Sequence, residues 1–136
     1  MKTFKTVTAA LLLTVAVSAT AADNNQLKLK SDMRSMLSAM EAIQSGGFYK
    51  NKESMIEGVK RLKKGLNSLR SSDAKRYLPK DQAYADKFAN KRADMIAMYA
   101  DDITVSIKDG NWDDALNDYQ QMLGQCTSCH LRIRSW

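Results

Sequence analysis

Apolar side chains recur at intervals of three and four residues along most of the chain, and this spacing predicts four amphipathic helices. We expect them over residues 25–45, over 52–69, from about 81 to 108, and from 111 towards the carboxyl end. The apolar stripe of the first helix is Leu29, Met33, Met36, Leu37, Met40 and Ile43, and that of the second is Met55, Val59, Leu62, Leu66 and Leu69. The stripe of the third helix is Tyr84, Phe88, Met95, Met98 or Tyr99, and Ile103. The stripe of the fourth helix is Trp112, Leu116, Tyr119, Met122, Leu123, Cys126, Cys129 or His130, and Ile133. Strand signals, meaning alternating runs bounded by hairpin turns, are nearly absent from the sequence.

Turn and capping residues separate these helices. The expected helix ends are marked by Gly46-Gly47, by residues 71–73 with Pro79, and by Asp109-Gly110. Asn111 is a good N-cap for the last helix, and Asp113 and Asp114 fall in its first turn, where carboxylates favour the helix dipole. Because the links within the first pair and within the last pair are short, the sequence predicts an all-α, antiparallel four-helix bundle.

The amino terminus has the order of a secretory signal peptide. Lys2 and Lys5 precede an uncharged apolar run over residues 9–19, and a small-x-small site ends at Ala21. A membrane anchor is the alternative interpretation, but the apolar run is shorter than the roughly 20 residues that span a bilayer. We therefore expect residues 1–21 to be a signal peptide and residues 22–136 to form a single exported, periplasmic domain without stable membrane insertion.

Charge excludes some classes of function. The formal net charge of +6 for 136 residues falls to +4 once Lys2 and Lys5 are removed with the signal peptide, and the remaining charges are scattered. No basic stripe carries interleaved aromatic residues, so nucleic-acid binding is not expected. No acid–base pair or nucleophile stands out, so the chain is not expected to be an enzyme.

The two cysteines and the single histidine lie within five consecutive positions, in the run Cys126-Thr127-Ser128-Cys129-His130. This is the attachment pattern of a c-type haem. Two thiols on one helical turn reach the two vinyl groups on one edge of the porphyrin, and the adjacent histidine meets the iron as proximal ligand. The pattern predicts one covalently attached haem c per chain.

Three other interpretations of the cysteines fit less well. A redox dithiol of the thioredoxin type calls for a βαβ context, which is missing. A zinc site needs four Cys or His ligands, and the chain offers three. A disulfide across so small a loop would add little stability and would leave His130 unexplained.

With this pattern at the end of the last helix, the chain resembles the class II cytochromes c, the family of cytochrome c′ and its low-spin relatives. Gly110-Asn111 opens the last helix as in the family, and Ile133 and Arg134 follow the histidine at the family's third and fourth places. The first helix has the family's methionine spacing at Met33, Met36 and Met40. The resemblance implies a four-helix bundle with haem near the end of the last helix.

The resemblance also implies a role for the first helix. Met33 falls at the family's distal position, and ligation by Met33 would complete a His–Met pair suited to single-electron transfer with periplasmic redox proteins. Met36 is the next candidate. An open distal site would instead give a five-coordinate protein that binds NO or CO, and a structural haem subunit of a larger redox complex is a third possibility.

Two further expectations come from the family. Leu29 stands where the family often has an arginine, so a basic contact to a haem propionate would come from Lys28 or Lys30, or be absent. A homodimer through the first two helices is possible.

Overall fold

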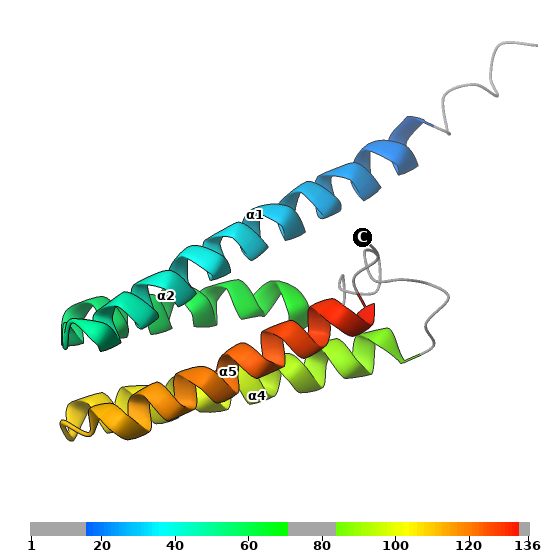
Figure 1. The fold of residues 1–136 in the computed structure, drawn as a ribbon. Coiled ribbons are helices and arrows are strands. Elements are labelled where there is room, and N and C mark those ends of the chain that lie inside the picture. The colour runs from blue at the N-terminus through cyan, green and yellow to red at the C-terminus, as the bar shows by residue number, and fades with distance from the viewer. Residues whose placement is uncertain (1–15, 71–83, 134–136) are drawn as a thin grey trace, which may run out of the picture.

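The computed structural model describes residues 16–70 and 84–133, leaving out the side chains of residues 16–23, 25 and 26. These residues form four helices: α1 (Ala16–Phe48), α2 (Lys52–Arg70), α4 (Ala85–Lys108) and α5 (Trp112–Ile133) (Figure 1). The described segments contain no strand. The predicted all-α class is therefore confirmed for this part of the chain. Residues 1–15 of the expected signal peptide, the 71–83 connection with the expected helix start near 81, and Arg134 lie outside it.

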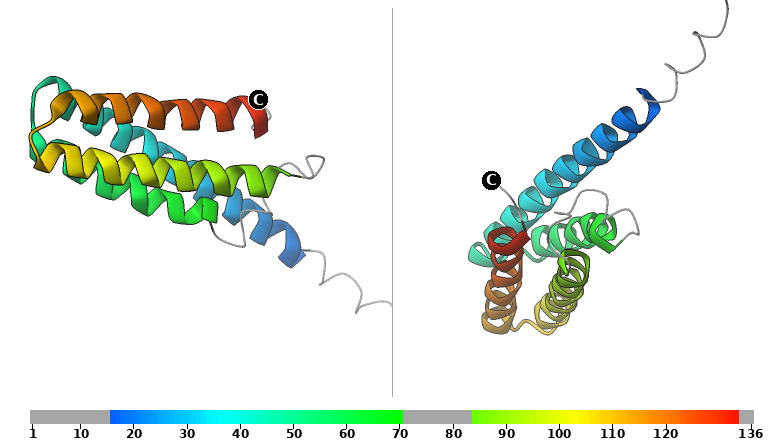
Figure 2. Two further views of the ribbon diagram at one scale, coloured as in Figure 1. Left: turned by 90° about the horizontal axis from the view of Figure 1, so that it is seen from below. Right: turned by 90° about the vertical axis from the view of Figure 1, so that its right-hand side faces the viewer.

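The helices pack as two pairs. α1 lies against α2 and α4 against α5, and contacts between α2 and α4 join the pairs (Figure 2). Contacts between α1 and α5 are the sparsest in the bundle, because α1 diverges from the other helices towards its amino end. None of the helices in the two described segments is long and apolar enough to cross a bilayer.

Glycines bring α1 and α2 into close contact. A Cβ atom on Gly58 would lie 2.7 Å from Cγ1 of Ile43 and 2.9 Å from the carbonyl oxygen of Ala39. A Cβ on Gly65 would overlap Met36. Rising residue numbers in α1 thus meet falling numbers in α2, and little space separates the two backbones.

The first helix is longer than predicted, and Gly46-Gly47 does not end it. Both glycines lie inside α1 and are buried. A Cβ on Gly46 would lie 2.6 Å from Cγ of Met55, and a Cβ on Gly47 would touch Leu116 of α5. The two glycines allow close packing of α1 against α2 and α5, and they do not end the helix. The chain turns instead at Lys50, whose φ is 52°, and the Asn51 side chain caps α2 by accepting a 2.9 Å hydrogen bond from the Ser54 amide.

The second helix follows the prediction closely. α2 ends one residue beyond the expected position, and all five residues of its predicted stripe are buried.

The third predicted stripe is wrong. Tyr84 is exposed, Met98 is exposed, and Phe88, Met95 and Tyr99 are only partly buried. Of that stripe only Ile103 belongs to the buried face, whose members are Ala85, Ala89, Ala93, Ile96, Ala97, Ala100, Ile103 and Ile107. Small alanine side chains let α4 approach its neighbours closely, so the larger residues are displaced to the edges of the contact.

The connection between α4 and α5 is as predicted. Gly110 has φ of 76°, the left-handed conformation that glycine adopts without strain. Asn111 caps α5 by accepting a hydrogen bond of 3.3 Å from the Asp114 amide. Asp113 and Asp114 lie in the first turn.

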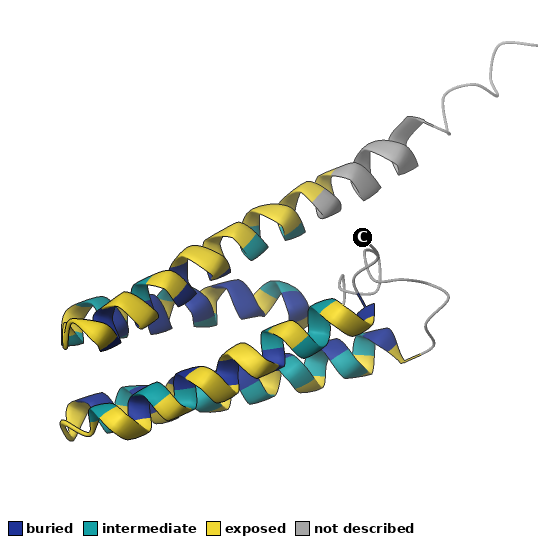
Figure 3. Ribbon diagram, viewed as in Figure 1, coloured by how far each residue is buried: buried dark blue, intermediate teal, exposed yellow. Residues whose placement is uncertain are grey.

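Two further predicted core residues are exposed. Leu37 of α1 is 61% exposed and Leu123 of α5 is 42% exposed. The apolar period is correct in both helices, but the two helices stand apart and do not cover these side chains. Figure 3 shows that α1 becomes mostly exposed towards its amino end (Figure 3).

We expect Gly58→Ala to lower the free energy of unfolding by about 1–3 kcal/mol, the usual cost of overpacking a core, because backbone atoms of α1 cannot move aside. The matched control is Gly124→Ala on the exposed side of α5, where a Cβ would have no neighbour within 4 Å. Since alanine favours helix over glycine, this control should raise stability by about 0.5–1 kcal/mol. Urea unfolding followed by circular dichroism measures both. Equal effects of the two substitutions would contradict the close contact.

Candidate cofactor-binding site

Cys126, Cys129 and His130 lie in the last turns of α5, and each is partly buried. Their spacing of three and four residues places them on one face of the helix. Both cysteines are free thiols. The arrangement presents two sulfur atoms and an imidazole to the same side of α5, in a helical segment that is already formed.

The two cysteines pack against different parts of the interior. Cys126 lies against the main core cluster, which Leu29 and Met33 of α1 also contact from its edge. Cys129 lies against a small second cluster of Ala85, Ala89 and Ile133, together with Phe88. The cysteine pair therefore spans the junction between the two clusters.

Burial controls the ionisation of both thiols. Loss of hydration raises the pKa of Cys126 to about 11, with a further contribution from Cys129. Burial also raises the pKa of Cys129, although the positive charge of Arg92 acts in the opposite direction. Both groups are therefore protonated at neutral pH, and neither has the low pKa of a reactive redox thiol.

Arg92 of α4 makes the main polar contact with this part of α5. Its Nη1 donates a hydrogen bond to Oε1 of Gln125, which is itself buried. The guanidinium lies over the ring of Phe88, 4.7 Å from its centroid, and Arg132 contacts the same ring at 4.9 Å. Among the residues that the structure describes, the buried Nε of Arg92 has no hydrogen-bond partner. A cation thus lies beside Cys129, held by neutral groups.

Met33 and His130 are equally far along their helices from a contact between α1 and α5. Gly47 of α1 lies against Leu116 of α5. Met33 precedes Gly47 by 14 residues, and His130 follows Leu116 by 14. Two heptads advance a helix by about 21 Å and turn it by only about 40°, so each residue stays near the face of its contact. Both 14-residue separations lead to the end of the molecule where α1 begins and α5 ends.

The other two methionines of α1 are more deeply buried. Met36 is 7% exposed and Met40 is 6% exposed. The sulfur of Met36 lies against α2, since a Cβ built on Gly65 would be 3.1 Å from it. Met33 is only partly buried, so its thioether lies at the border of the core.

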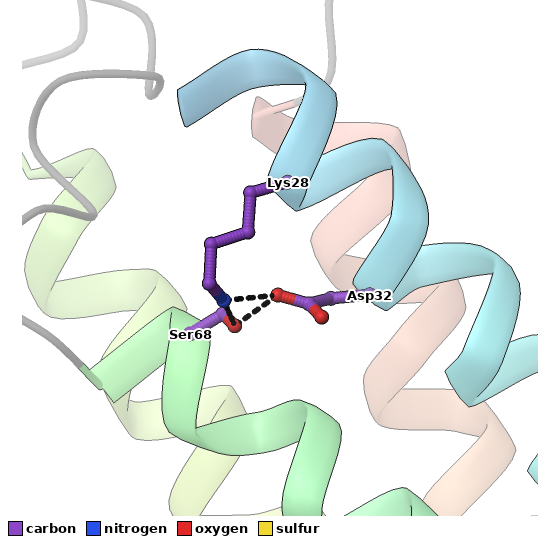
Figure 4. Close-up of polar contacts among 3 residues, drawn as sticks. All are labelled: Lys28, Asp32 and Ser68. Carbon is purple, nitrogen blue, oxygen red and sulfur yellow. Dashed lines mark hydrogen bonds and ion pairs between the residues drawn. The ribbon is translucent and has the colours of Figure 1, made fainter. Parts of the chain in front are cut away.

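A polar contact fixes α1 to α2 beside Met33. Lys28 donates hydrogen bonds from Nζ to Asp32 (2.7 Å) and Ser68 (2.9 Å), and the Ser68 hydroxyl donates to Asp32 (Figure 4). Burial alone would raise the pKa of the Asp32 carboxyl, but the hydrogen bonds and the charge of Lys28 outweigh it and hold that pKa below its usual value. Lys28 and Lys30 are both exposed, and Lys28 is hydrogen-bonded to Ser68 of α2.

The exposed leucines lie on the same two faces. Leu37 follows Met33 by four residues, and Leu123 lies seven residues before His130. Exposed apolar side chains therefore lie on α1 and α5, two helices that make few contacts with each other.

The donor set differs from that of a bare metal site. Within residues 16–70 and 84–133, no three His, Cys, Asp or Glu side chains converge as an ion would require. A porphyrin does not need this convergence, because the thiols bind its vinyl carbons and only the axial ligands meet the iron. The free thiols and the imidazole fit the chemistry of haem attachment.

A comparison of the chain with known protein families, curated proteins and solved structures finds no match.

The sequence prediction did not include Arg92, Gln125, or the contact of Lys28 and Asp32 with Ser68. Arg92 and Phe88 are four residues apart, a spacing that places them on one face of α4. The i,i+4 spacing of Lys28 and Asp32 is likewise readable from the sequence. Their partners on other helices are not.

Alkylation of the haem-free chain tests the burial of Cys126. In the wild-type chain, the pKa of about 11 leaves Cys126 with roughly a hundredfold less thiolate at pH 8 than the ordinary value of 9.0 would, and peptide mass spectrometry follows the alkylation of Cys126 separately from that of Cys129. Reaction with iodoacetamide should therefore be about a hundredfold slower than that of an exposed thiol, and it should quicken about tenfold per pH unit between pH 8 and 10. A rate that levels off below pH 9 would contradict the burial.

Proposed function

We propose that this chain is a periplasmic monohaem c-type cytochrome that carries single electrons, with haem c attached near the end of the last helix of an antiparallel four-helix bundle. The observation that supports the proposal is the presence of Cys126, Cys129 and His130 on one face of α5. Met33 is proposed as the distal ligand because Met33 and His130 each lie 14 residues from the contact of Gly47 with Leu116. Two axial donors and two thiols would then surround one haem.

Each residue has a defined role in this proposal. A haem bound here supplies an iron couple that gains and loses one electron. Cys126 and Cys129 would hold it by thioether bonds, and His130 and Met33 would be its proximal and distal ligands. Leu37 and Leu123, which are now exposed, would provide apolar contacts for the ring and lose their contact with water.

The choice of Met33 over Met36 rests on packing. The sulfur of Met36 lies against Gly65, so ligation by Met36 would require α1 to rotate away from α2. Asp32, the residue before Met33, is fixed to Ser68 of α2 and opposes this rotation. Met33 can face α5 without any change in the α1–α2 contact.

Electron transfer follows from two axial ligands, because a six-coordinate iron has no free position for a substrate. Thioether ligation also raises the potential of the couple relative to ligation by two nitrogens. Redox proteins of the periplasm are the corresponding partners.

Binding of NO or CO is the second candidate function. It is favoured by the divergence of α1 from α5, which leaves Met33 only partly buried. If Met33 does not reach the iron, the distal position is open to a gas. The absorption spectrum distinguishes the two functions, since a His–Met haem is low-spin and an open site is high-spin.

Covalent attachment is tested first. Protein made in a host with c-type maturation should retain one haem after acid–acetone extraction. Cys126→Ala/Cys129→Ala should bind none and should lose helical signal, because the ring would be a large part of so small a core. Extraction of free haem from the wild-type protein would refute the proposal.

Met33→Leu tests the distal ligand. The substitution keeps the side-chain volume and by itself usually costs less than about 1.5 kcal/mol, so the fold should remain. The spectrum should change from low-spin to high-spin, the potential should fall, and the reduced protein should bind CO readily. Met36→Leu is the matched control and should leave the spectrum unchanged. A wild-type protein that is already high-spin and binds CO at once would favour the gas-binding function.

A further inference from the structure

The electron-transfer site proposed for this chain does not include the positive charge of Arg92. Arg92 is partly buried on α4, and its partners are the amide oxygen of Gln125, the ring of Phe88 and, at 4.0 Å, the sulfur of Met95. In the part of the chain that the structure describes, the ion pairs are Lys28–Asp32, Lys63–Asp101 and Arg70–Asp94, and none of them includes Arg92.

Holding a cation in this way costs free energy. A partly buried charge loses hydration, and without a carboxylate it regains little of that loss. Its Nε is buried without a hydrogen-bond partner, which adds to the cost. The arrangement nevertheless fixes the guanidinium against the cysteine-bearing turns of α5, since Gln125 directly precedes Cys126.

A fixed cation at this place favours an added electron nearby. Reduction lowers the positive charge of a haem iron by one unit, so a neighbouring positive charge stabilises the reduced form relative to the oxidised form. Because the guanidinium is shielded from water, salt screens it less than it screens the surface lysines.

We propose that Arg92 is a positioning residue with two effects: it holds the haem-attachment turn of α5 against α4, and its charge raises the reduction potential of the bound haem. This inference rests on the proposed function, because it needs a haem at Cys126 and Cys129.

Arg92→Gln removes the charge. We expect the matured variant to keep its covalent haem and low-spin spectrum, while the equilibrium constant for reduction falls about tenfold, which is ~59 mV for a one-electron couple. Arg92→Lys keeps the charge and should stay within about threefold of the wild type. Potentiometric titration followed by absorbance measures all of these proteins.

Arg61→Gln is the matched control. Arg61 also has a buried Nε without a partner, but its guanidinium lies beside Ser38 on the α1–α2 side. Arg61→Gln should change the equilibrium constant for reduction by less than about threefold. An equal fall in Arg61→Gln and Arg92→Gln would overturn the proposal, because the effect would then belong to net charge alone.

Gln125→Glu decides the question if Arg92→Gln does not fold. It keeps the acceptor oxygen for Arg92 and nearly the same size, but it neutralises the charge in place. The potential should fall as for Arg92→Gln. Haem-loaded variants with an unchanged reduction potential would overturn the role of Arg92 and leave the proposed electron transfer intact. A wild-type protein without covalent haem would instead refute the proposed function itself.

Discussion

The close contact between α1 and α2 determines how the rest of the molecule is arranged. At Gly58 backbone atoms of α1, and at Gly65 the side chain of Met36, leave no space for a Cβ atom, so α1 cannot rotate freely about its axis against α2. The contact turns Ala39 and Ile43 towards α2, while Gly47 lies against Leu116 of α5. In the proposed site, the choice of Met33 as distal ligand would therefore depend on glycines of α2, which would not touch the cofactor.

Large apolar residues made much of the fold predictable. The stripe of α2 and the capped start of α5 follow from side chains whose burial or hydrogen bonding is almost obligatory. The prediction was wrong in α4, because the buried face there is mostly alanine, which a search for large apolar residues overlooks. It was wrong at Gly46-Gly47 because glycine can either end a helix or admit a close neighbour, and only the neighbour decides.

Part of the candidate site could likewise be predicted from the sequence, and part of it could not. The spacing of Cys126, Cys129 and His130 is local, so the sequence alone predicts that they share a face of α5. The contact of Arg92 with Gln125 joins residues 33 positions apart, and it depends on how α4 and α5 are rotated against each other. Periodicity predicts that each helix has a buried face, but it does not predict which polar side chain of one helix meets which of another.

The two helix pairs supply complementary halves of the proposed site. α5, supported by α4, carries the thiols and the imidazole, while α1, supported by α2, carries the thioether. Protein contacts join the pairs mainly between α2 and α4, and the α1–α5 side is sparse and lined by exposed leucines. A ring attached to α5 and coordinated from α1 would close this side and complete the core. The cofactor would then be a structural element, and ligation by Met33 would link the redox state of the iron to the packing of α1.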